Sequence, residues 1–307
     1  MIELRQEIPA ELTQPLEDWF CGLTRSSWML YHEGPGKPHY VMGYFETREE
    51  AAAAWAELRR SFRRLPETCP MGELADRDWK EAYKEHLKPW SHGRLHWVPS
   101  WMRGNHEVPA KAAVIWFDAG LAFGTGDHPT TRLCAIRLME FMEGRDARAL
   151  RVTDAGCGSG ILALSAARLG CGQVAGFDRD PEAVRVSLAN REENGIPAEA
   201  VAFDHHGLEA GLPWAGAADV VLANIISDVL LIYADNLLAS TAPGGVLALS
   251  GILATEQARV RSHFEEKARV AWGGCRSDGR VMGEWSDVAL FRPTGLPSAR
   301  SSPQSPA

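Results

Sequence analysis

A glycine-rich turn between a strand and a helix constrains this chain more than any other feature. The turn, Asp154 to Gly160, follows the apolar run 149–152 and opens onto the apolar stretch 161–169. Glycines at such a junction let a ligand touch bare backbone and lie over the N–H groups that begin the helix. The dinucleotide-binding fingerprint has its third glycine three residues after the second, where this chain has Ile161. We therefore predict a strand–turn–helix unit whose ligand is not a dinucleotide.

An acidic residue follows at the distance expected for a nucleoside site. The stretch 172–177 reads as the next strand, and it ends in Asp178. A carboxylate at that position can accept hydrogen bonds from both ribose hydroxyls. The alternative is a tight turn with a solvated aspartate, but the turn and the acid together favour a bound nucleoside.

Strands and helices alternate through the rest of the chain, which predicts a mostly parallel, doubly wound α/β sheet. The expected segments are 150–154, 161–169, 173–178, 181–194, 199–203, 218–223, 227–238, 246–250 and 256–267. A late strand at 286–291 is expected to close the sheet. Ligands in such sheets bind beyond the carboxyl ends of the strands, where Asn224 ends the fourth one. Its amide oxygen could accept a hydrogen bond from an amine; a strand-end cap is the alternative.

The first 72 residues follow a different pattern. Their segments alternate in the order β-α-β-β-α-β, which suggests a small ferredoxin-like α+β domain. Thr47 and Glu50 form a capping box before one of its helices. We expect a helical connector at 73–92, the ligand-binding domain at 93–293 and a disordered Ser- and Pro-rich tail at 294–307.

Composition excludes several classes of protein. The chain has 307 residues and a formal net charge of −8, which argues against a general nucleic-acid binder. It has no apolar run of membrane-spanning length and no signal-peptide pattern. Six cysteines without metal-ligand spacing indicate reduced thiols and no metal site. We expect a cytoplasmic monomer that does not contact membranes.

Three further groups of polar residues are candidates for contacts. Thr130 and Thr131 stand near a helix start, where their hydroxyls could cap the helix or bind a ligand carboxylate. His205 and His206 follow a strand without an acid or cysteine cluster and are expected to be loop residues. Four arginines between 59 and 64 are expected to form a solvated face, with contact to RNA or an acidic partner as the alternative.

Several blocks together resemble one family, the bacterial methyltransferases of the eleventh large-subunit ribosomal protein. The turn 154–160, with its D-x-G-C-G-S-G pattern, is typical of enzymes that use S-adenosylmethionine (SAM). The loop 120–131 is similar to the hallmark loop of the family, and 78–89 is similar to its connector. The family departs from this chain at two positions, because Ala119 and Asp127 stand where it usually has Pro and Thr. The resemblance covers residues 73–291.

The resemblance implies a class I SAM-dependent methyltransferase domain behind a ferredoxin-like domain that recognises the ribosomal protein. It implies methyl transfer to lysine ε-amines and to the N-terminal α-amine of that protein, with Asn224 as the catalytic residue. The cofactor-binding positions it implies are Thr131, Gly156, Asp178, Asn224, Phe123, Gly124, Asp154 and Gly158.

Alternatives to this interpretation remain at the level of sequence. The same chemistry could act on a lysine of another protein or on a small amine. A nicotinamide-dependent oxidoreductase is disfavoured by Ile161, and a SAM-binding module without catalysis is disfavoured by the combination of Thr131, Asp178 and Asn224.

Overall fold

The computed structural model describes residues 2–21, 27–32, 37–73, 88–117 and 128–295. The chain divides into two compact units, Met1–His86 and Leu87–Ala307. Most of the predicted connector, residues 74–87, lies outside the described residues. Residues 296–307 of the predicted tail also lie outside them.

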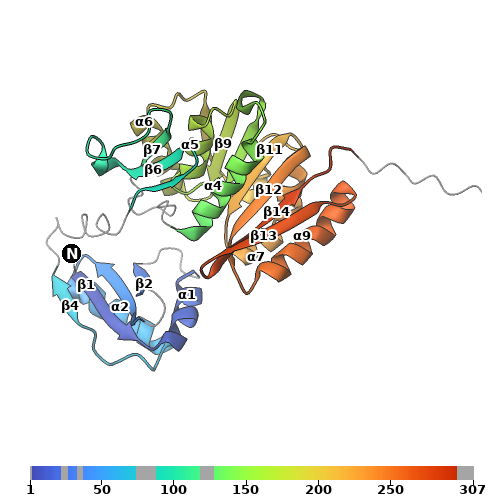
Figure 1. Cartoon of the computed structure of the whole chain (residues 1–307). Helices are drawn as coiled ribbons and strands as arrows, with labels where there is room; N and C mark the ends of the chain where they lie inside the picture. The colour runs from blue at the N-terminus through green and yellow to red at the C-terminus, as the bar shows by residue number, and fades with distance from the viewer. Residues whose placement is uncertain (1, 22–26, 33–36, 74–87, 118–127, 296–307) are drawn as a thin grey trace, which may run out of the picture. The chain divides into compact units, whose positions relative to one another are not determined.

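In its described part, the first unit is a four-stranded antiparallel sheet with helices packed on it (Figure 1). Its elements are β1 (Ile2–Ile8), η1 (Ala10–Leu12), α1 (Thr13–Cys21), β2 (Trp28–His32), β3 (His39–Phe45), α2 (Arg48–Ser61) and β4 (Met71–Glu73). The strands lie in the order β2-β3-β1-β4. Alternation along β1 and β3 places Leu4 and Val41 in one core with Leu16 and Leu58.

Helix α2 begins with the capping box that the sequence indicates. The Glu50 backbone N–H donates to Thr47 Oγ1 at 3.1 Å, and the Thr47 N–H donates to the Glu50 carboxylate at 3.3 Å. Two orphan donors at the helix start are satisfied in this way.

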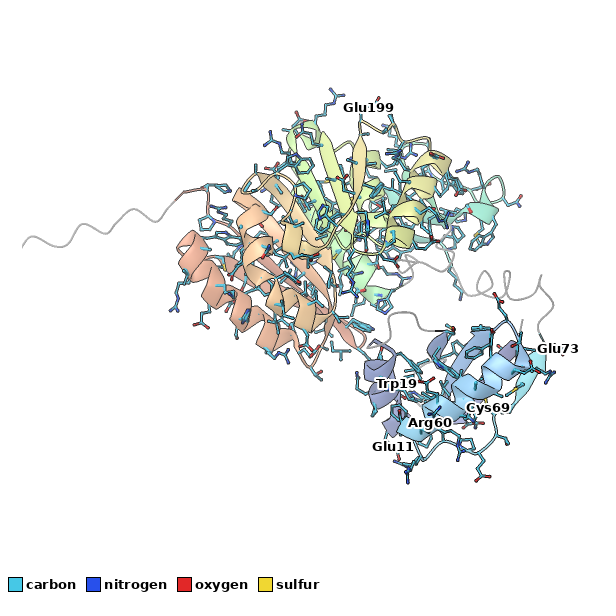
Figure 2. The ribbon with its side chains drawn as sticks, turned by 180° about the vertical axis from the view of Figure 1, so that it is seen from behind. Glu11, Trp19, Arg60, Cys69, Glu73 and Glu199 are labelled. Carbon is cyan, nitrogen blue, oxygen red and sulfur yellow. The ribbon has the colours of Figure 1, made fainter. Side chains whose placement is uncertain are left out.

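The arginines in the last turn of α2 and just after it are partly engaged within their own unit. Arg64 forms an ion pair with Glu11 at 2.7 Å, and both side chains are exposed. The Arg59 Nε donates to the Leu65 carbonyl at 3.3 Å, and Arg60 is exposed (Figure 2). These contacts agree with the solvated face expected from the sequence. Exposed ion pairs of this kind contribute little to the free energy of folding.

Residues 128–295 of the second unit are built around a seven-stranded sheet in the order β10-β9-β8-β11-β12-β14-β13 (Figure 1). Its strands are β8 (Arg151–Ala155), β9 (Gln173–Asp178), β10 (Val201–His205), β11 (Ala218–Asn224), β12 (Thr241–Leu253), β13 (Arg276–Met282) and β14 (Trp285–Phe291). The first five in this order pair in parallel, and β14 and β13 add antiparallel. The predicted doubly wound sheet is therefore confirmed.

Helices cover both faces of this sheet. They are α4 (Pro129–Met142), α5 (Ile161–Arg168), α6 (Pro181–Glu193), α7 (Ser227–Ile232), α8 (Ala234–Ser240) and α9 (Gln257–Trp272), with short 3-10 turns η3 (Ala147–Ala149) and η4 (Leu208–Ala210). Alternate residues of β11 enter different cores: Val220 and Leu222 pack with α4 and α5, whereas Val221 and Ala223 pack with α7, α8 and α9. A strand buried on both faces explains the continuous apolar run from 220 to 223.

Residues 88–117 form a smaller sheet of the second unit, in the order β5-β6-β7. Its strands are β5 (Trp90–His92), β6 (Leu95–Pro99) and β7 (Ala113–Phe117), and η2 (Ser100–Met102) follows β6. The prediction of a connector up to residue 92 is wrong at its end, because Trp90–His92 pairs antiparallel with β6. The buried Trp97 of β6 donates its indole N–H to Ser165 Oγ of α5 at 2.8 Å, which anchors this sheet to the larger one.

Two predictions about the later elements are corrected. The helix expected at 227–238 is divided at Tyr233, whose backbone (φ −102°, ψ 22°) leaves the helical region. The strand at 286–291 does not close the sheet, because β13 pairs on its outer side. The sequence of β13 alternates charged and small residues and therefore resembles a loop, but such charges are common on edge strands.

Candidate active site

The predicted residues meet at the carboxyl ends of three adjacent strands. In the register of the sheet, Ala155 of β8 lies opposite Phe177 of β9 on one side and Ala223 of β11 on the other. Gly156, Asp178 and Asn224 each follow one of these three residues. Since β8, β9 and β11 run in parallel, their next residues converge on one edge of the sheet.

The first glycine of the turn is required by both conformation and space. Gly156 has φ 69°, a left-handed conformation that residues with a side chain rarely adopt. A Cβ there would lie 3.0 Å from the Ile225 side chain, just beyond the end of β11. The N–H groups of Gly156 and Cys157 both donate to the Phe177 carbonyl, at 2.9 and 3.0 Å. The turn is thereby held to the end of β9.

The far side of the turn is held by helix α6. Ser187 Oγ donates to the Gly158 carbonyl at 2.8 Å, and the buried Asn190 side chain donates to the Ser159 carbonyl at 2.9 Å. A Cβ on Gly160, which has φ 77°, would come within 2.8 Å of Ser187 Oγ. Sequence reasoning missed Ser187 and Asn190, because neither belongs to the glycine motif and both lie on a helix whose pattern indicates only packing.

Asp154 lies beneath the turn and is fully buried. Its Oδ2 accepts a hydrogen bond from the Ala163 N–H in the first turn of α5 at 3.0 Å. Its Oδ1 has no partner among the described residues. Burial raises the pKa of Asp154 to about 7; the Ala163 hydrogen bond opposes this increase and the charge of Asp178 adds to it.

Asp178 connects the end of β9 to the turn. One carboxylate oxygen accepts from the Gly158 N–H at 3.0 Å, and the other accepts from the Asp180 N–H at 3.0 Å. The residue is partly exposed. Each carboxylate oxygen has two acceptor positions, so Asp178 retains capacity for the two hydroxyls of a ribose.

Asn224 and Thr131 form the other half of the site. The Asn224 side-chain N–H₂ donates to Thr131 Oγ1 at 3.2 Å, which joins the end of β11 to the first turn of α4. Thr131 is buried, and the buried Asn224 Oδ1 has no partner among the described residues. A buried acceptor without a partner is uncommon and indicates a position for a ligand donor.

The sequence left open whether Thr130 and Thr131 cap α4 or bind a ligand carboxylate. The cap is His128, whose ring Nδ1 accepts from the Thr130 N–H at 3.4 Å and lies 2.7 Å from Thr130 Oγ1. The hydroxyl of Thr131 does not cap the start of the helix and is available to orient Asn224.

Gly251 supports Asn224 from behind. It has φ 82°, and a Cβ there would lie 2.6 Å from the Ile225 carbonyl oxygen. The Ile225 N–H donates to the Ser250 carbonyl at 3.0 Å. The backbones of β11 and β12 thus approach closely at the residue that follows Asn224, which fixes the position of this side chain.

The remaining predicted positions divide into two groups. Phe123 and Gly124 lie outside the described residues, as do Ala119 and Asp127. Of the two histidines expected in a loop, His205 is instead the last residue of β10, and His206 follows the strand and stacks on Phe177 with ring centroids 4.3 Å apart. Among the described residues no group of three or more His, Cys, Asp or Glu could hold a metal ion. No described helix is both long and apolar enough to span a membrane.

The site offers acceptors on one side and backbone on the other. Asp154, Asp178 and Asn224 Oδ1 provide negative charge or unused lone pairs within a bed of glycine backbone. Such a combination suits a ligand that carries hydroxyls and positive charge. It can orient a nucleophile and stabilise a cation.

Comparison with known proteins agrees with this chemistry. A family model described as "Ribosomal protein L11 methyltransferase (PrmA)" matches residues 27–277. A protein named ribosomal protein L11 methyltransferase from Dechloromonas aromatica is 46% identical over 182 residues, which cover 59% of this chain and 56% of that protein. Another of the same name from Azotobacter vinelandii is 41% identical over 230 residues, 74% of each chain.

A solved structure extends the match to the fold. The crystal structure of the ribosomal protein L11 methylase from Lactobacillus delbrueckii subsp. bulgaricus has a TM-score of 0.53 and 28% identity, and it covers 65% of this chain and 95% of that one. The predicted class I methyltransferase fold is confirmed. By its sequence match over residues 27–277 and its sheet topology, the chain belongs to the ribosomal protein L11 methyltransferase family.

Proposed function

We propose that this protein transfers methyl groups from SAM to lysine ε-amines and the N-terminal α-amine of ribosomal protein L11. The observation that carries the proposal is the Asn224 side chain. It is fixed by Thr131 at 3.2 Å, and within the part of the chain that the structure describes its buried Oδ1 has no hydrogen-bond partner. Membership of the family supports the reaction and its protein substrate.

The residues at the strand ends fit the cofactor. Gly156 and Gly158, at φ 69° and 54°, leave space for the amino-acid part of SAM against bare backbone. Asp178 would accept hydrogen bonds from the ribose, and Asp154 Oδ1, which no described residue contacts by a hydrogen bond, would face the positive charge. Thr131 would hold Asn224 in place. Phe123 and Gly124, which precede α4 in the sequence, would complete this proposed set.

Positioning accounts for the chemistry of this site. When bound, SAM supplies a methyl group on a positively charged sulfur. The attacking amine must be neutral, and its reference pKa of about 10.4 for lysine means that it loses a proton to solvent first. Asn224 Oδ1 accepts a hydrogen bond from the amine N–H and so directs the nitrogen lone pair. As the new C–N bond forms the C–S bond breaks, and the product ammonium releases its proton to water.

The division of labour along the chain is part of the proposal. Residues 1–72 would form the ferredoxin-like, substrate-recognising domain, residues 73–92 the connector and residues 93–293 the catalytic domain. The enzyme would act as a monomer in the cytoplasm, where the ribosomal protein is made. The rival target, another protein or a small amine, is not favoured by the comparisons.

Mass spectrometry tests this proposal directly. The purified protein, SAM and ribosomal protein L11 are incubated, and intact and digested masses of the substrate are measured. We expect methylation at amines with the wild-type enzyme and its loss with Asn224→Ala. Ribosomal proteins from a deletion strain provide the second arm, in which an unchanged methylation pattern would exclude the proposed substrate.

A further inference from the structure

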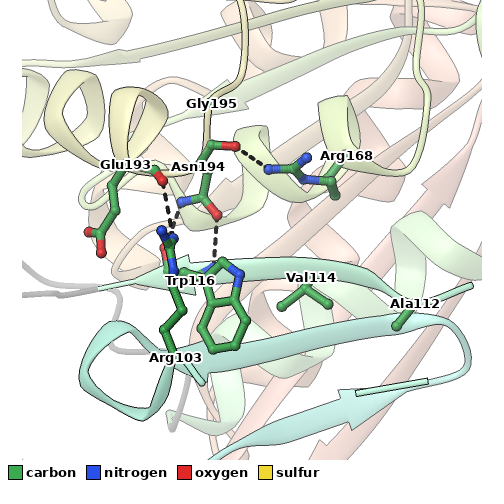
Figure 3. A pocket seen from close by; sticks show the side chains of 8 residues that line it. All are labelled: Arg103, Ala112, Val114, Trp116, Arg168, Glu193, Asn194 and Gly195. Carbon is green, nitrogen blue, oxygen red and sulfur yellow. Dashed lines mark hydrogen bonds between the residues drawn. The ribbon is translucent and has the colours of Figure 1, made fainter. Parts of the chain in front are cut away.

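A concave region lies at the other end of helix α5 from the glycine turn. It is a groove of about 490 Å³ between the outer face of β7 and the carboxyl-terminal ends of α5 and α6 (Figure 3). Val114 and Trp116 of β7 form its floor, and Arg103 and Arg168 stand at its sides. Nothing in the proposed methyl transfer uses these residues.

The groove is built on a rigid frame. The Asn194 side chain accepts a hydrogen bond from the Trp116 N–H at 2.8 Å, and its N–H₂ donates to the Trp116 carbonyl at 2.6 Å. The same N–H₂ donates to the Asn190 carbonyl at 2.8 Å. The floor strand and the helix end are thus locked together, so the groove does not depend on a bound ligand for its shape.

Both arginines are held at the end of α6. Arg103 Nη2 donates to the Glu193 carbonyl at 3.1 Å, and Arg168 Nη2 donates to the Asn194 carbonyl (Figure 3). Within the described part of the chain, neither guanidinium forms an ion pair with a carboxylate. Capping of a helix end explains one N–H of each arginine, and the Arg103 guanidinium also lies over the Trp116 ring, 5.2 Å from its centroid. Neither contact supplies an anionic partner for the two guanidinium groups.

The charge of this pair is incompletely compensated. Arg168 Nε is buried and has no hydrogen-bond partner among the described residues. Burial lowers the pKa of Arg168, and the nearby positive charge of Arg103 lowers it further. A buried donor without an acceptor, beside a second cation, favours an anion that accepts from both.

We propose that this groove binds an oxyanion, a phosphate or carboxylate group, between Arg103 and Arg168. The planar guanidinium groups present paired N–H donors that match such a group, and Arg168 Nε supplies the donor that now lacks a partner. An apolar part of the same ligand would lie on Val114 and Trp116. The site is separate from the proposed SAM site and does not depend on it.

Titration of the full-length protein with inorganic phosphate tests the proposal. Isothermal calorimetry is done at fixed ionic strength, with chloride replacing phosphate in the reference, and with saturating S-adenosylhomocysteine to cover the glycine turn. We expect saturable binding that weakens at least about tenfold in Arg103→Ala. A parallel titration with succinate distinguishes a carboxylate site from a phosphate site, and binding of either one supports an oxyanion site.

The control is Arg185→Ala, which removes an exposed cation from α6 that pairs with Glu182 at 2.6 Å. It should bind phosphate like the wild type. Arg168→Lys keeps the charge but removes Nε, so an intermediate affinity is expected even if other Arg168 variants fold poorly. In the NMR spectrum of the wild type, the Arg168 Nε–H resonance should shift on titration. The absence of saturable binding by both anions, or equal weakening in Arg103→Ala and Arg185→Ala, would overturn the proposal.

Discussion

The carboxyl edge of the large sheet and the groove beside β7 differ in their unpaired polar groups. The edge holds hydrogen-bond acceptors, whereas the groove holds positively charged donors. At the edge, acceptors gather around glycine backbone, with Asp154 Oδ1 and Asn224 Oδ1 left unpartnered among the described residues. In the groove, two guanidiniums stand together without a carboxylate that pairs with either in the described chain. Helix α5 connects the two regions, since it begins at the glycine turn and ends at Arg168. Buried acceptors without partners therefore indicate a ligand that carries donors or positive charge, and buried cationic donors without partners indicate an anionic ligand.

The largest expected effect contrasts Arg168 with an arginine that has its partners. Arg137 is 3% exposed and bonds both carboxylate oxygens of Asp287, at 2.7 and 2.8 Å. Asp287→Ala should lower the free energy of unfolding by about 3 kcal/mol, because the buried Arg137 loses two charged hydrogen bonds and keeps only its ion pair with Asp278. Arg168→Met should lower it by only about 1 kcal/mol. Urea unfolding of both variants measures the difference, and similar losses would mean that Arg168 has compensation not apparent in its contacts.

The next effect concerns turnover at the carboxyl edge. Asn224→Ala should reduce kcat by about 100-fold, since the amine loses the acceptor that directs it. SAM affinity should fall much less. The control is Asn236→Ala, which removes a side chain that donates to the Leu208 carbonyl at 3.0 Å and lies outside the site. Steady-state kinetics with the ribosomal protein would refute the role of Asn224 if both variants kept the same kcat.

A smaller effect separates the conformation of a glycine from its place in the site. Gly156→Ala adds strain of about 1–2 kcal/mol at φ 69° and brings a Cβ to 3.0 Å from Ile225. Gly170→Ala has a similar backbone demand at φ 94°, but its Cβ would meet nothing within 4 Å. Both should destabilise the fold, and only Gly156→Ala should weaken SAM binding in calorimetry. Equal SAM affinities would remove Gly156 from the cofactor site.

The smallest expected effect is a pH dependence of SAM affinity at the carboxyl edge of the sheet. Because the pKa of Asp154 is raised to about 7 in the folded protein, the buried carboxyl is protonated below that pH. A cationic ligand beside it favours the charged form, so SAM affinity should rise with pH up to about 7 and then level off. The slope should not exceed about tenfold per pH unit. Asp154→Asn should flatten the profile.

The same pKa predicts a stability trend of opposite sign. A carboxyl whose folded pKa lies above its unfolded value favours folding when protonated. Its contribution is therefore lost as the pH rises from about 4, the unfolded value, to about 7. Thermal unfolding of the wild type without ligand should show this decrease relative to Asp154→Asn. A wild type that instead gained stability over this range relative to the variant would contradict the raised pKa.

The sequence predicted those parts of the site that are encoded locally. Strand, turn and helix around Asp154–Gly160 follow from neighbouring residues, and Asn224 follows from the rule that strand ends carry ligands. The pairing of Asn224 with Thr131 could not be predicted, because 93 positions separate them along the chain. Ser187 and Asn190, which support the turn from α6, were missed because the pattern of that helix indicates only packing.

The groove lies further beyond the reach of the sequence. Arg103 and Arg168 belong to different elements, and neither spacing nor motif connects them. Only the burial of Arg168 Nε, which is a property of the folded chain, distinguishes these residues from ordinary surface arginines.

Strand β13 was missed because its charged residues give no apolar alternation.

Asn194 has a consequence for how copies of this chain behave near one another. Strand β7 ends the three-stranded sheet, so its outer peptide groups could recruit a strand from another molecule. The Asn194 amide occupies both the N–H and the carbonyl of Trp116, as the peptide of a neighbouring strand would. One side chain thus occupies the middle of an open edge and leaves the Trp116 peptide groups without a free donor or acceptor for an added strand.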